Sequence, residues 1–312
     1  MTILVTGSAG HLGEAVIRTL RASGRTCRGL DRIASPFTDV VGSIVEPAVV
    51  DRAMDGVDQV IHAATLHKPH VATHSRRAFV DTNITGTLNL LEAAVRAGVR
   101  AFLFTSTTSV FGDALVPAPD RPAAWITEDV LPVAKNIYGV TKLAAEELCA
   151  LAHRNQGLAV LVLRTSRFFP EADDDPRAAA SYADANLKTT ELLYRRVDVE
   201  DAVAAHLVAL ERAPAIGFGR YIITATTPFT RDDTGELRSN PEAVLDRRVP
   251  AWREAYRARE WRMLPSFDRV YDNTRARVEL GWRPHHDFAT VLARGDVRSP
   301  LAHAIGLKGY GV

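Results

Sequence analysis

The chain has 312 residues, 46% of them hydrophobic, so it is long enough to bury a sizeable core. Its 38 lysine and arginine residues nearly balance 37 aspartate and glutamate residues, and no overall field favours nucleic acid or an anionic membrane. The two cysteines, Cys27 and Cys149, fit reduced core thiols better than a disulfide or a metal site. The sequence enters a strand-like run at once and has no apolar run near the roughly 20 residues of a membrane helix, so we expect a cytoplasmic protein.

Short β-branched runs alternate with longer amphipathic runs in the first half of the chain. Strict alternation of strand and helix predicts parallel strands joined by right-handed crossovers, with helices on both faces of the sheet. The third helix carries Leu88, Leu91 and Val95 at helical spacing, which predicts one buried face. The expected strands are Thr2–Thr6, Thr26–Asp31, Gln59–His62, Ala101–Thr105 and Ala159–Arg164, and the expected helices are His11–Ala22, Pro47–Met54, Arg77–Ala97 and Ile137–Asn155.

The pattern changes after Arg164. An acidic stretch, Glu171–Arg177, reads as an exposed loop or lid. A strand at Tyr194–Val199, a helix at Glu200–Glu211 and a strand at Arg220–Ala225 return to the sheet, and the remainder is mostly helical. We therefore expect an α/β fold: a doubly wound, Rossmann-type parallel sheet from residues 1–164 and 196–225, with a smaller, mostly helical C-terminal lobe from residues 165–195 and 226–312.

A glycine-rich turn joins the first expected strand to the first helix. Gly7, Gly10 and Gly13 allow a tight turn and let backbone N–H groups approach a pyrophosphate at a helix N-terminus. Their Gly-x-x-Gly-x-x-Gly spacing differs from the usual dinucleotide fingerprint. Asp31 ends the second strand, where a carboxylate accepts hydrogen bonds from ribose hydroxyls and repels a 2′-phosphate. The pattern favours NAD over NADP, although Arg32 could stack on adenine or meet a phosphate.

A phenol and an ammonium, Tyr138 and Lys142, lie four residues apart on one face of an expected helix. A tyrosine ordinarily has a pKa near ~10, too high for efficient base catalysis at neutral pH. A nearby ammonium and an oxidised nicotinamide would both lower that pKa. The pair therefore predicts acid/base chemistry once it is placed beside a dinucleotide.

These motifs together resemble the extended short-chain dehydrogenase/reductases, the group of NAD-dependent sugar-nucleotide epimerases and dehydratases. The matching segments are the glycine turn, His62–Thr65, Asn83–Ala94, Thr105–Gly112, Tyr138–Lys142, Val197–Asp201 and Leu280–Pro284. The resemblance implies an enzyme in which Thr107, Tyr138 and Lys142 are catalytic. The residues it implies for NAD binding are Gly7, Gly10, His11, Leu12, Gly13, Asp31, Arg32, Ala63, Ala64, Thr65, Asn83, Thr105, Tyr138 and Lys142.

The sequence departs from the family where the substrate would bind. Thr108 and Ser109 stand where the 4,6-dehydratases have Asp-Glu, which disfavours dehydration, and Arg164–Glu171 matches its family segment only loosely. A metal site at His67, His70 and His74 is disfavoured, because no cysteine or carboxylate ligand stands nearby. The candidate substrate residues are His67, Lys68, Thr108, Arg167, Asn186 and Arg196.

The same three catalytic residues could perform either of two reactions. We favour a sugar or sugar-nucleotide epimerase; the alternative is an NAD-dependent dehydrogenase of a free sugar, uronate or other polyol. A non-catalytic NAD sensor is disfavoured, because a sensor does not need the phenol–ammonium pair. Extra apolar positions on two helices, at Leu90, Ala94, Leu148 and Leu151, and the family resemblance suggest a symmetric homodimer; deeper burial within one subunit is the alternative.

Overall fold

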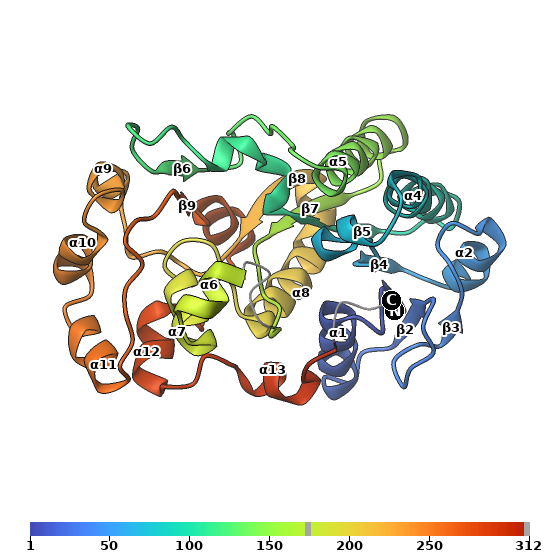
Figure 1. Cartoon of the computed structure of the whole chain (residues 1–312). Helices are drawn as coiled ribbons and strands as arrows, with labels where there is room; N and C mark the ends of the chain where they lie inside the picture. Colours follow the sequence, from blue (N-terminus) through green and yellow to red (C-terminus); the bar gives the residue numbers. More distant parts are fainter. Residues whose placement is uncertain (172–175, 309–312) are drawn as a thin grey trace.

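A seven-stranded parallel sheet forms the centre of the computed structural model, which describes residues 1–171 and 176–308 (Figure 1). Its strand order is β3-β2-β1-β4-β5-β7-β8. The strands are β1 (Ile3–Thr6), β2 (Cys27–Asp31), β3 (Val40–Val41), β4 (Gln59–His62), β5 (Ala101–Thr107), β7 (Val160–Thr165) and β8 (Phe218–Ile223). This arrangement confirms the expected doubly wound α/β fold.

Helices cover both faces of the sheet (Figure 1). One face carries α1 (His11–Ala22), α8 (Val199–Ile216) and α13 (Pro300–Ile305); the other carries α2 (Pro47–Met54), α4 (Gly86–Arg96) and α5 (Ile137–Gln156). Two apolar cores result, one between the sheet and α1 and α8, the other between the sheet and α2, α4 and α5. Helix α1 begins and ends where periodicity predicts, because Leu12, Val16 and Leu20 recur on its sheet-facing side.

The second lobe is mostly helical and has its own aromatic core, which includes Trp252, Tyr256, Phe267 and Phe288. Its helices are α6 (Pro176–Ser181), α7 (Asp184–Glu191), α9 (Thr234–Leu237), α10 (Pro241–Arg248), α11 (Trp252–Ala258) and α12 (Phe288–Arg294). A two-stranded parallel sheet ties β6 (Ala124–Ile126) to β9 (Arg269–Tyr271). The segment between β5 and α5 is thereby bonded to the C-terminal part of the chain.

The predicted strand Tyr194–Val199 is wrong. Only one isolated bridge, between Arg167 and Arg196, forms there, and α8 begins at Val199. The carboxylate of Asp198 accepts the backbone N–H of Glu200 at 2.7 Å and so caps the helix. Val197 is fully buried in the core between the sheet and α8. The apolar residues that suggested a strand therefore pack against the sheet and do not form part of it.

The predicted helix Arg77–Ala97 is interrupted by a wider turn. Helix α3 (Arg76–Phe79) passes into a π-helical segment, η2 (Val80–Thr85), before α4 begins. Within α4 the buried face is formed by Leu90, Leu91, Ala93 and Ala94, so Leu91 is buried as predicted, whereas Leu88 is 38% exposed. The prediction that Leu88 belongs to the buried stripe is therefore wrong.

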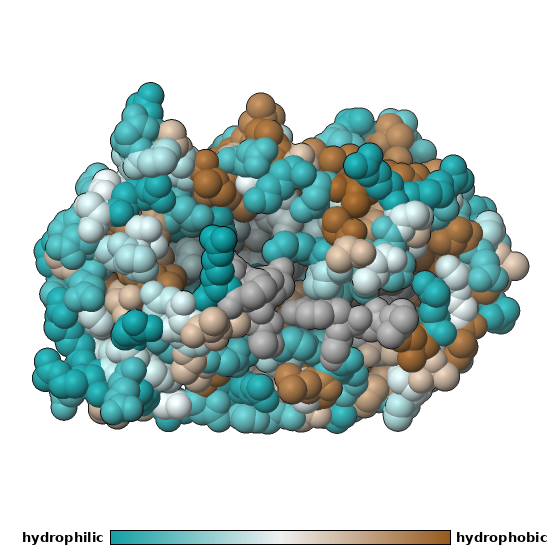
Figure 2. Space-filling model, viewed as in Figure 1, coloured by the Kyte–Doolittle hydropathy of each residue, from teal (hydrophilic) through white to brown (hydrophobic). Residues whose placement is uncertain are grey.

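The apolar positions that suggested a dimer divide into two groups. Leu90 and Ala94 are fully buried inside the subunit and Leu148 packs against the same core, whereas Leu151 is 41% exposed. Hydrophobic surface lies over the corner of the molecule formed by α4 and α5 (Figure 2). No helix among residues 1–171 and 176–308 is long and apolar enough to cross a membrane.

Candidate active site

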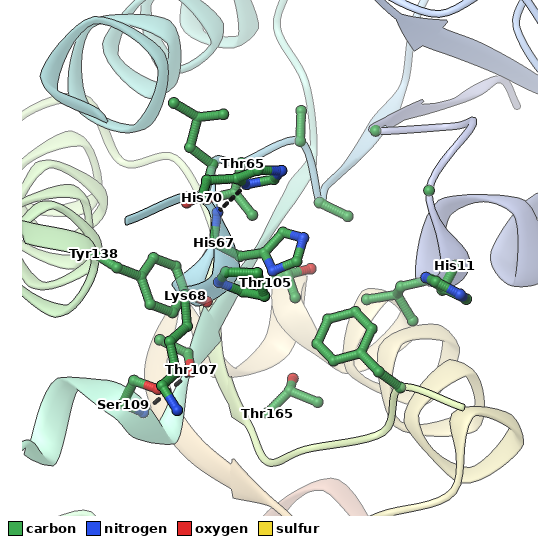
Figure 3. A pocket seen from close by; sticks show the side chains of 18 of the residues that line it. His11, Thr65, His67, Lys68, His70, Thr105, Thr107, Ser109, Tyr138 and Thr165 are labelled. Atoms are coloured by element: carbon green, nitrogen blue, oxygen red, sulfur yellow. Dashed lines mark hydrogen bonds between the residues drawn. The ribbon is translucent and has the colours of Figure 1, made fainter. Parts of the chain in front are cut away.

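A cavity of about 900 Å³ lies at the carboxyl ends of the strands. The chain order reverses between β1 and β4, because β1 continues to β2 on one side while β4 lies on the other. Crevices at such switch points bind ligands in open α/β sheets. The glycine-rich turn forms one end of the wall, and the ends of β4, β5 and β7 form the other (Figure 3).

The glycine-rich turn is built for close approach to a ligand. Gly7 has a φ of +73°, and a Cβ there would lie 2.7 Å from the backbone nitrogen of Ala64. A Cβ on Gly13 would lie 2.0 Å from the carbonyl oxygen of Gly7. No side chain caps α1, and no described residue accepts a hydrogen bond from the backbone N–H of His11 or Leu12. These donors and the helix dipole suit a diphosphate.

Asp31 is held at the wall by the backbone. Its two carboxylate oxygens accept the N–H groups of Ala9 and Ile33, each at 3.0 Å. Each oxygen keeps a further lone pair, so the carboxylate can also accept ribose hydroxyls. Arg32 lines the same end of the cavity. This end therefore fits a dinucleotide, as the sequence predicted.

Ala63, Ala64 and Thr65 follow β4 and line the middle of the cavity. The backbone N–H of Ala64 donates to Thr6 Oγ1 at 3.2 Å, which fixes this turn against β1. Thr105 also lines the cavity, and its hydroxyl is bonded to Nε2 of the buried His206 at 2.9 Å.

Asn83 does not line the cavity, contrary to its predicted contact with the cofactor. It lies buried behind the wall, where Oδ1 accepts the backbone N–H of Leu66 at 2.9 Å and Nδ2 donates to the hydroxyl of Thr141 at 3.0 Å. Asn83 thus joins the loop after β4 to helix α5. Its role is to position the turn and Tyr138's helix relative to each other.

Thr107 and Tyr138 lie next to each other on the cavity wall (Figure 3). Thr107 ends β5, and its Oγ1 accepts the backbone N–H of Ser109 at 3.1 Å. Tyr138 lies in the first turn of α5, which Asn136 caps by accepting the N–H of Gly139 at 3.0 Å. Burial raises the pKa of Tyr138 to about 12, although a hydrogen bond with the Thr107 side chain partly opposes this shift. A phenol with this pKa needs a nearby positive charge to act as a base at neutral pH.

Lys142 lies one turn further along α5, behind the cavity wall. It is 2% exposed, and its ammonium lies 4.0 Å from the centroid of the Phe104 ring. Burial lowers its pKa to about 7, opposed by Cys149 and Glu146. Lys142 does not line the cavity, although the sequence predicted that it contacts the cofactor.

A buried ion pair fixes α5 against the strands that carry the site. Glu146 is fully buried, accepts the Ser106 hydroxyl at 2.6 Å and pairs with Arg164 at 2.8 Å. Ser106 precedes Thr107, and Arg164 is near the end of β7. Removing one member would leave a buried charge without its partner, which is strongly destabilising.

The predicted substrate residues fall into two groups. His67, Lys68, Thr108 and Arg167 line the cavity, and Lys68 extends past Tyr138 toward Thr107 and Ser109 in Figure 3. Burial, with smaller effects from His70 and His11, lowers the pKa of His67 to about 3, so its imidazole is neutral.

Asn186 and Arg196 do not line the cavity. Asn186 accepts the backbone N–H of Arg262 at 3.1 Å, and Arg196 pairs with Glu191 at 2.8 Å and donates to the carbonyl of Phe169. Both stabilise the second lobe, and the prediction that they hold a substrate is not supported by their positions.

A cluster of arginines at the substrate end was only partly visible in the sequence. Glu191 is 1% exposed and contacts Arg167, Arg195 and Arg196 at 3.5, 2.6 and 2.8 Å. Burial alone would raise the pKa of Glu191, but the three arginines lower this pKa to about 2. Three guanidinium groups around one carboxylate leave a positive excess, and Arg167 and Arg195 present it to the cavity. Adjacent arginines in a sequence usually lie on the protein surface. Only the folded structure therefore distinguishes these arginines, which surround one buried carboxylate, from ordinary surface residues.

The acidic segment is a second region that sequence analysis placed incompletely. Glu171 lines the cavity at the nucleotide end and is only 11% exposed, and α6 begins at Pro176. The part of the expected lid at 172–175 lies outside the described residues.

Within the described ranges no group of histidine, cysteine and carboxylate side chains is arranged to hold a metal ion. The rings of His67 and His70 pack against each other, with their centroids 4.4 Å apart.

The parallel sheet, the glycine-rich turn and the neighbouring Thr107 and Tyr138 define a dinucleotide-binding protein of the short-chain dehydrogenase/reductase type. Comparison with known families agrees: the NAD dependent epimerase/dehydratase family matches residues 3–223. The chain belongs to this family.

Similar proteins differ in their reactions. A dTDP-glucose 4,6-dehydratase of Streptomyces antibioticus is 31% identical, over 94% of this chain and 91% of its own length. A 3-beta-hydroxysteroid dehydrogenase of Mycolicibacterium neoaurum is 29% identical over 55% of this chain, and this chain spans about half (48%) of that relative's length. A short-chain dehydrogenase/reductase superfamily protein of Agrobacterium tumefaciens, solved with bound NAD, is 25% identical with a TM-score of 0.68 and 97% coverage of both chains.

Proposed function

We propose that the protein is an NAD-dependent enzyme that acts at a carbinol carbon of an anionic sugar derivative, and that it epimerises a sugar or sugar nucleotide. The observation that carries the proposal is the position of Thr107 and Tyr138 between a dinucleotide site and an arginine-lined substrate end. The sheet domain of residues 1–164 and 196–225 would bind NAD. The lobe of residues 165–195 and 226–312, together with β6, would bind the substrate.

The residues divide the work as follows. Gly7–Gly13, Asp31 and Ala63–Thr65 hold the dinucleotide. NAD held by these residues would supply a hydride acceptor and a positive charge that favours the phenolate form of Tyr138. Tyr138 takes the hydroxyl proton and returns it in the reverse step. The hydroxyl of Thr107 hydrogen-bonds the reacting oxygen, and Lys142 supports the phenolate from behind.

The charge of the substrate follows from the cavity wall. Its only carboxylates among the described residues are Asp31 and Glu171, both at the nucleotide end. Lys68, Arg167 and Arg195 lie at the other end. Guanidinium groups recognise diphosphate and carboxylate groups in a bidentate manner, so either a sugar nucleotide or a uronate suits this end.

Dehydration is not favoured, although one similar protein is a dehydratase. Eliminating water needs an acid and a base next to the reacting carbons. Thr108 and Ser109 occupy the positions after Thr107 and carry no carboxylate. A dehydrogenase of a free uronate, sugar or polyol is the second candidate, because the arginine cluster fits a single carboxylate equally well. A non-catalytic NAD sensor is disfavoured by the neighbouring Thr107 and Tyr138.

We also propose a homodimer through α4 and α5. The exposed apolar residues of these helices are Leu88, Val140 and Leu151, and clustered exposed apolar side chains mark interaction surfaces. Light scattering at micromolar concentration should give twice the monomer mass, and a monomer mass would contradict the dimer.

A substrate screen separates the reactions. The protein with NAD is incubated with UDP-, GDP- and dTDP-sugars and with free aldoses and uronates, and products are resolved by NMR. Epimerisation interconverts sugars with no net NADH, whereas a dehydrogenase forms NADH in proportion to product. Stoichiometric NADH from a free uronate or aldose, without isomerisation of any nucleotide sugar, would replace the epimerase with the dehydrogenase. Arg195→Leu should raise KM for the anionic substrate far more than Arg283→Leu, an exposed control outside the cavity.

A further inference from the structure

Lys308, near the end of the chain, lies against the glycine-rich turn. Its ammonium donates to the carbonyl oxygen of Ala9 at 2.9 Å and to the carboxylate of Glu14. Its backbone N–H donates to the carboxylate of Glu171 at 3.0 Å. One residue thus contacts the turn, the first turn of α1 and the segment that follows β7.

The segment that carries Lys308 is anchored at its base. Helix α13 lies beside α1 in Figure 1, and Ala302 is buried in the same core as α1 and α8. The backbone N–H of Ser299 donates to Asp198 at 3.2 Å, and Ser299 Oγ caps α13. Packing therefore fixes the helix that ends at Ile305, shortly before Lys308.

Glu171 reaches the same place from the opposite direction. Its Oε1 lies 2.8 Å from Nε2 of His11, the first residue of α1, and both side chains are almost buried, with exposed fractions of 11% and 7%. His11, Glu171 and Lys308 line one cavity with Gly10 and Gly13. The two segments meet over the helix N-terminus at which a diphosphate would bind.

The charges explain why a lysine stands here. Glu14 and Glu171 place two carboxylates beside a site that must accept an anion, and like charges this close repel. Arg18 offsets Glu14 at 2.7 Å. Burial lowers the pKa of His11 below its ordinary value, although the carboxylate of Glu171 opposes this. Lys308 contacts the carboxylate of Glu14 through its ammonium and that of Glu171 through its backbone N–H.

We propose that Lys308 is a cofactor-retaining residue: it ties the C-terminal segment and Glu171 across the glycine-rich turn, so that NAD leaves only after these contacts break. The same ammonium offsets the carboxylate of Glu14, which would otherwise repel the diphosphate. The inference rests on NAD binding and is independent of whether the reaction is epimerisation or dehydrogenation.

The test measures NADH release directly. NADH-loaded protein is mixed with excess NAD in a stopped-flow instrument, and the loss of NADH fluorescence gives the dissociation rate. Lys308→Met should release NADH about two- to fivefold faster, since a part-exposed charged contact contributes up to about 1 kcal/mol and 1.4 kcal/mol is tenfold. Lys308→Arg should restore most of the retention. His303→Ala is the matched control, because His303 lies on α13, the helix before Lys308, and pairs with Asp296 on the surface, away from the cavity.

A double-mutant cycle tests whether Lys308 and Glu14 act through the same contact. If the contact acts as proposed, Lys308→Met combined with Glu14→Gln should release NADH no faster than Lys308→Met alone. Unchanged or slower release from Lys308→Met would overturn the inference, the slower case meaning that the contact competes with the cofactor. Failure of the wild-type protein to bind NADH at all would instead refute the cofactor assignment under the proposed function.

Discussion

Replacing Lys142 with methionine should stabilise the protein while it abolishes turnover. The ammonium is 2% exposed, and burial lowers its pKa from the ordinary 10.5 to about 7. Methionine keeps a similar length and volume, and Glu146 keeps its partner Arg164 at 2.8 Å. The substitution therefore removes a buried charge without leaving another unpaired.

The magnitude follows from linkage. Between pH 7 and 10.5 the unfolded chain binds the proton that the folded chain has lost, so the stability of the wild type rises with pH in this window. Below pH 7 the folded chain also binds the proton, so the folded protein carries the full free-energy cost of the buried charge. One pKa unit corresponds to about 1.36 kcal/mol, which gives an upper bound of about 5 kcal/mol at pH 6. Relaxation and the contact with Phe104 reduce the gain to about 1–3 kcal/mol.

Urea unfolding at pH 6 and pH 9 provides the assay, with the exposed Lys135→Met as control. The gain from Lys142→Met should shrink by up to about 2–3 kcal/mol between pH 6 and pH 9, because the wild type recovers stability over that range. Lys135→Met should show no such change. A Lys142→Met protein that is less stable at pH 6, or a gain that is independent of pH, would refute the reasoning.

Three further predictions test the remaining parts of the site. Tyr138→Phe should lower turnover by ~10²–10⁴-fold with little change in NADH affinity, measured by fluorescence titration, while Tyr182→Phe outside the cavity should be near normal. Asp31→Ser should narrow the preference for NAD over NADP, and equal wild-type affinity for the two cofactors would contradict the role of Asp31. Gly13→Ala should weaken NADH binding by at least about tenfold, because its Cβ would lie 2.0 Å from the carbonyl oxygen of Gly7; Gly235→Ala, with open space around it, should be silent.

Local signals in the sequence predicted the elements whose boundaries depend on neighbours along the chain. The bounds of α1, α2 and β4 agree with the predicted ones, because periodicity and the first helical residues act over a few positions. The spacing of Tyr138 and Lys142 likewise predicted that both lie on α5 close to β5.

Long-range pairing could not be read in the same way. The contact between Lys308 and Ala9 joins residues 299 positions apart, and β6 pairs with β9 across the whole second lobe. No local pattern encodes such partners. Asn186 and Arg196 failed as substrate residues for a related reason: a polar side chain near a cleft is equally well used by Arg262 or Glu191 inside the lobe.

The π-helical segment Val80–Thr85 gives this region a place that can absorb one residue. The carbonyl of Asn83 accepts the hydroxyl of Thr87 at 2.7 Å, and the wide turn holds one residue more than an α-helical turn would. Deleting a single residue there would restore α-helical hydrogen bonding with little rotation of α4 relative to α3, so Leu91 and Ala94 would stay in the core. Deleting a residue within α4 itself would instead rotate the residues that follow it by about 100° and carry buried positions out of the core. Changes of length should thus be tolerated in the π segment more readily than in the helix that follows it.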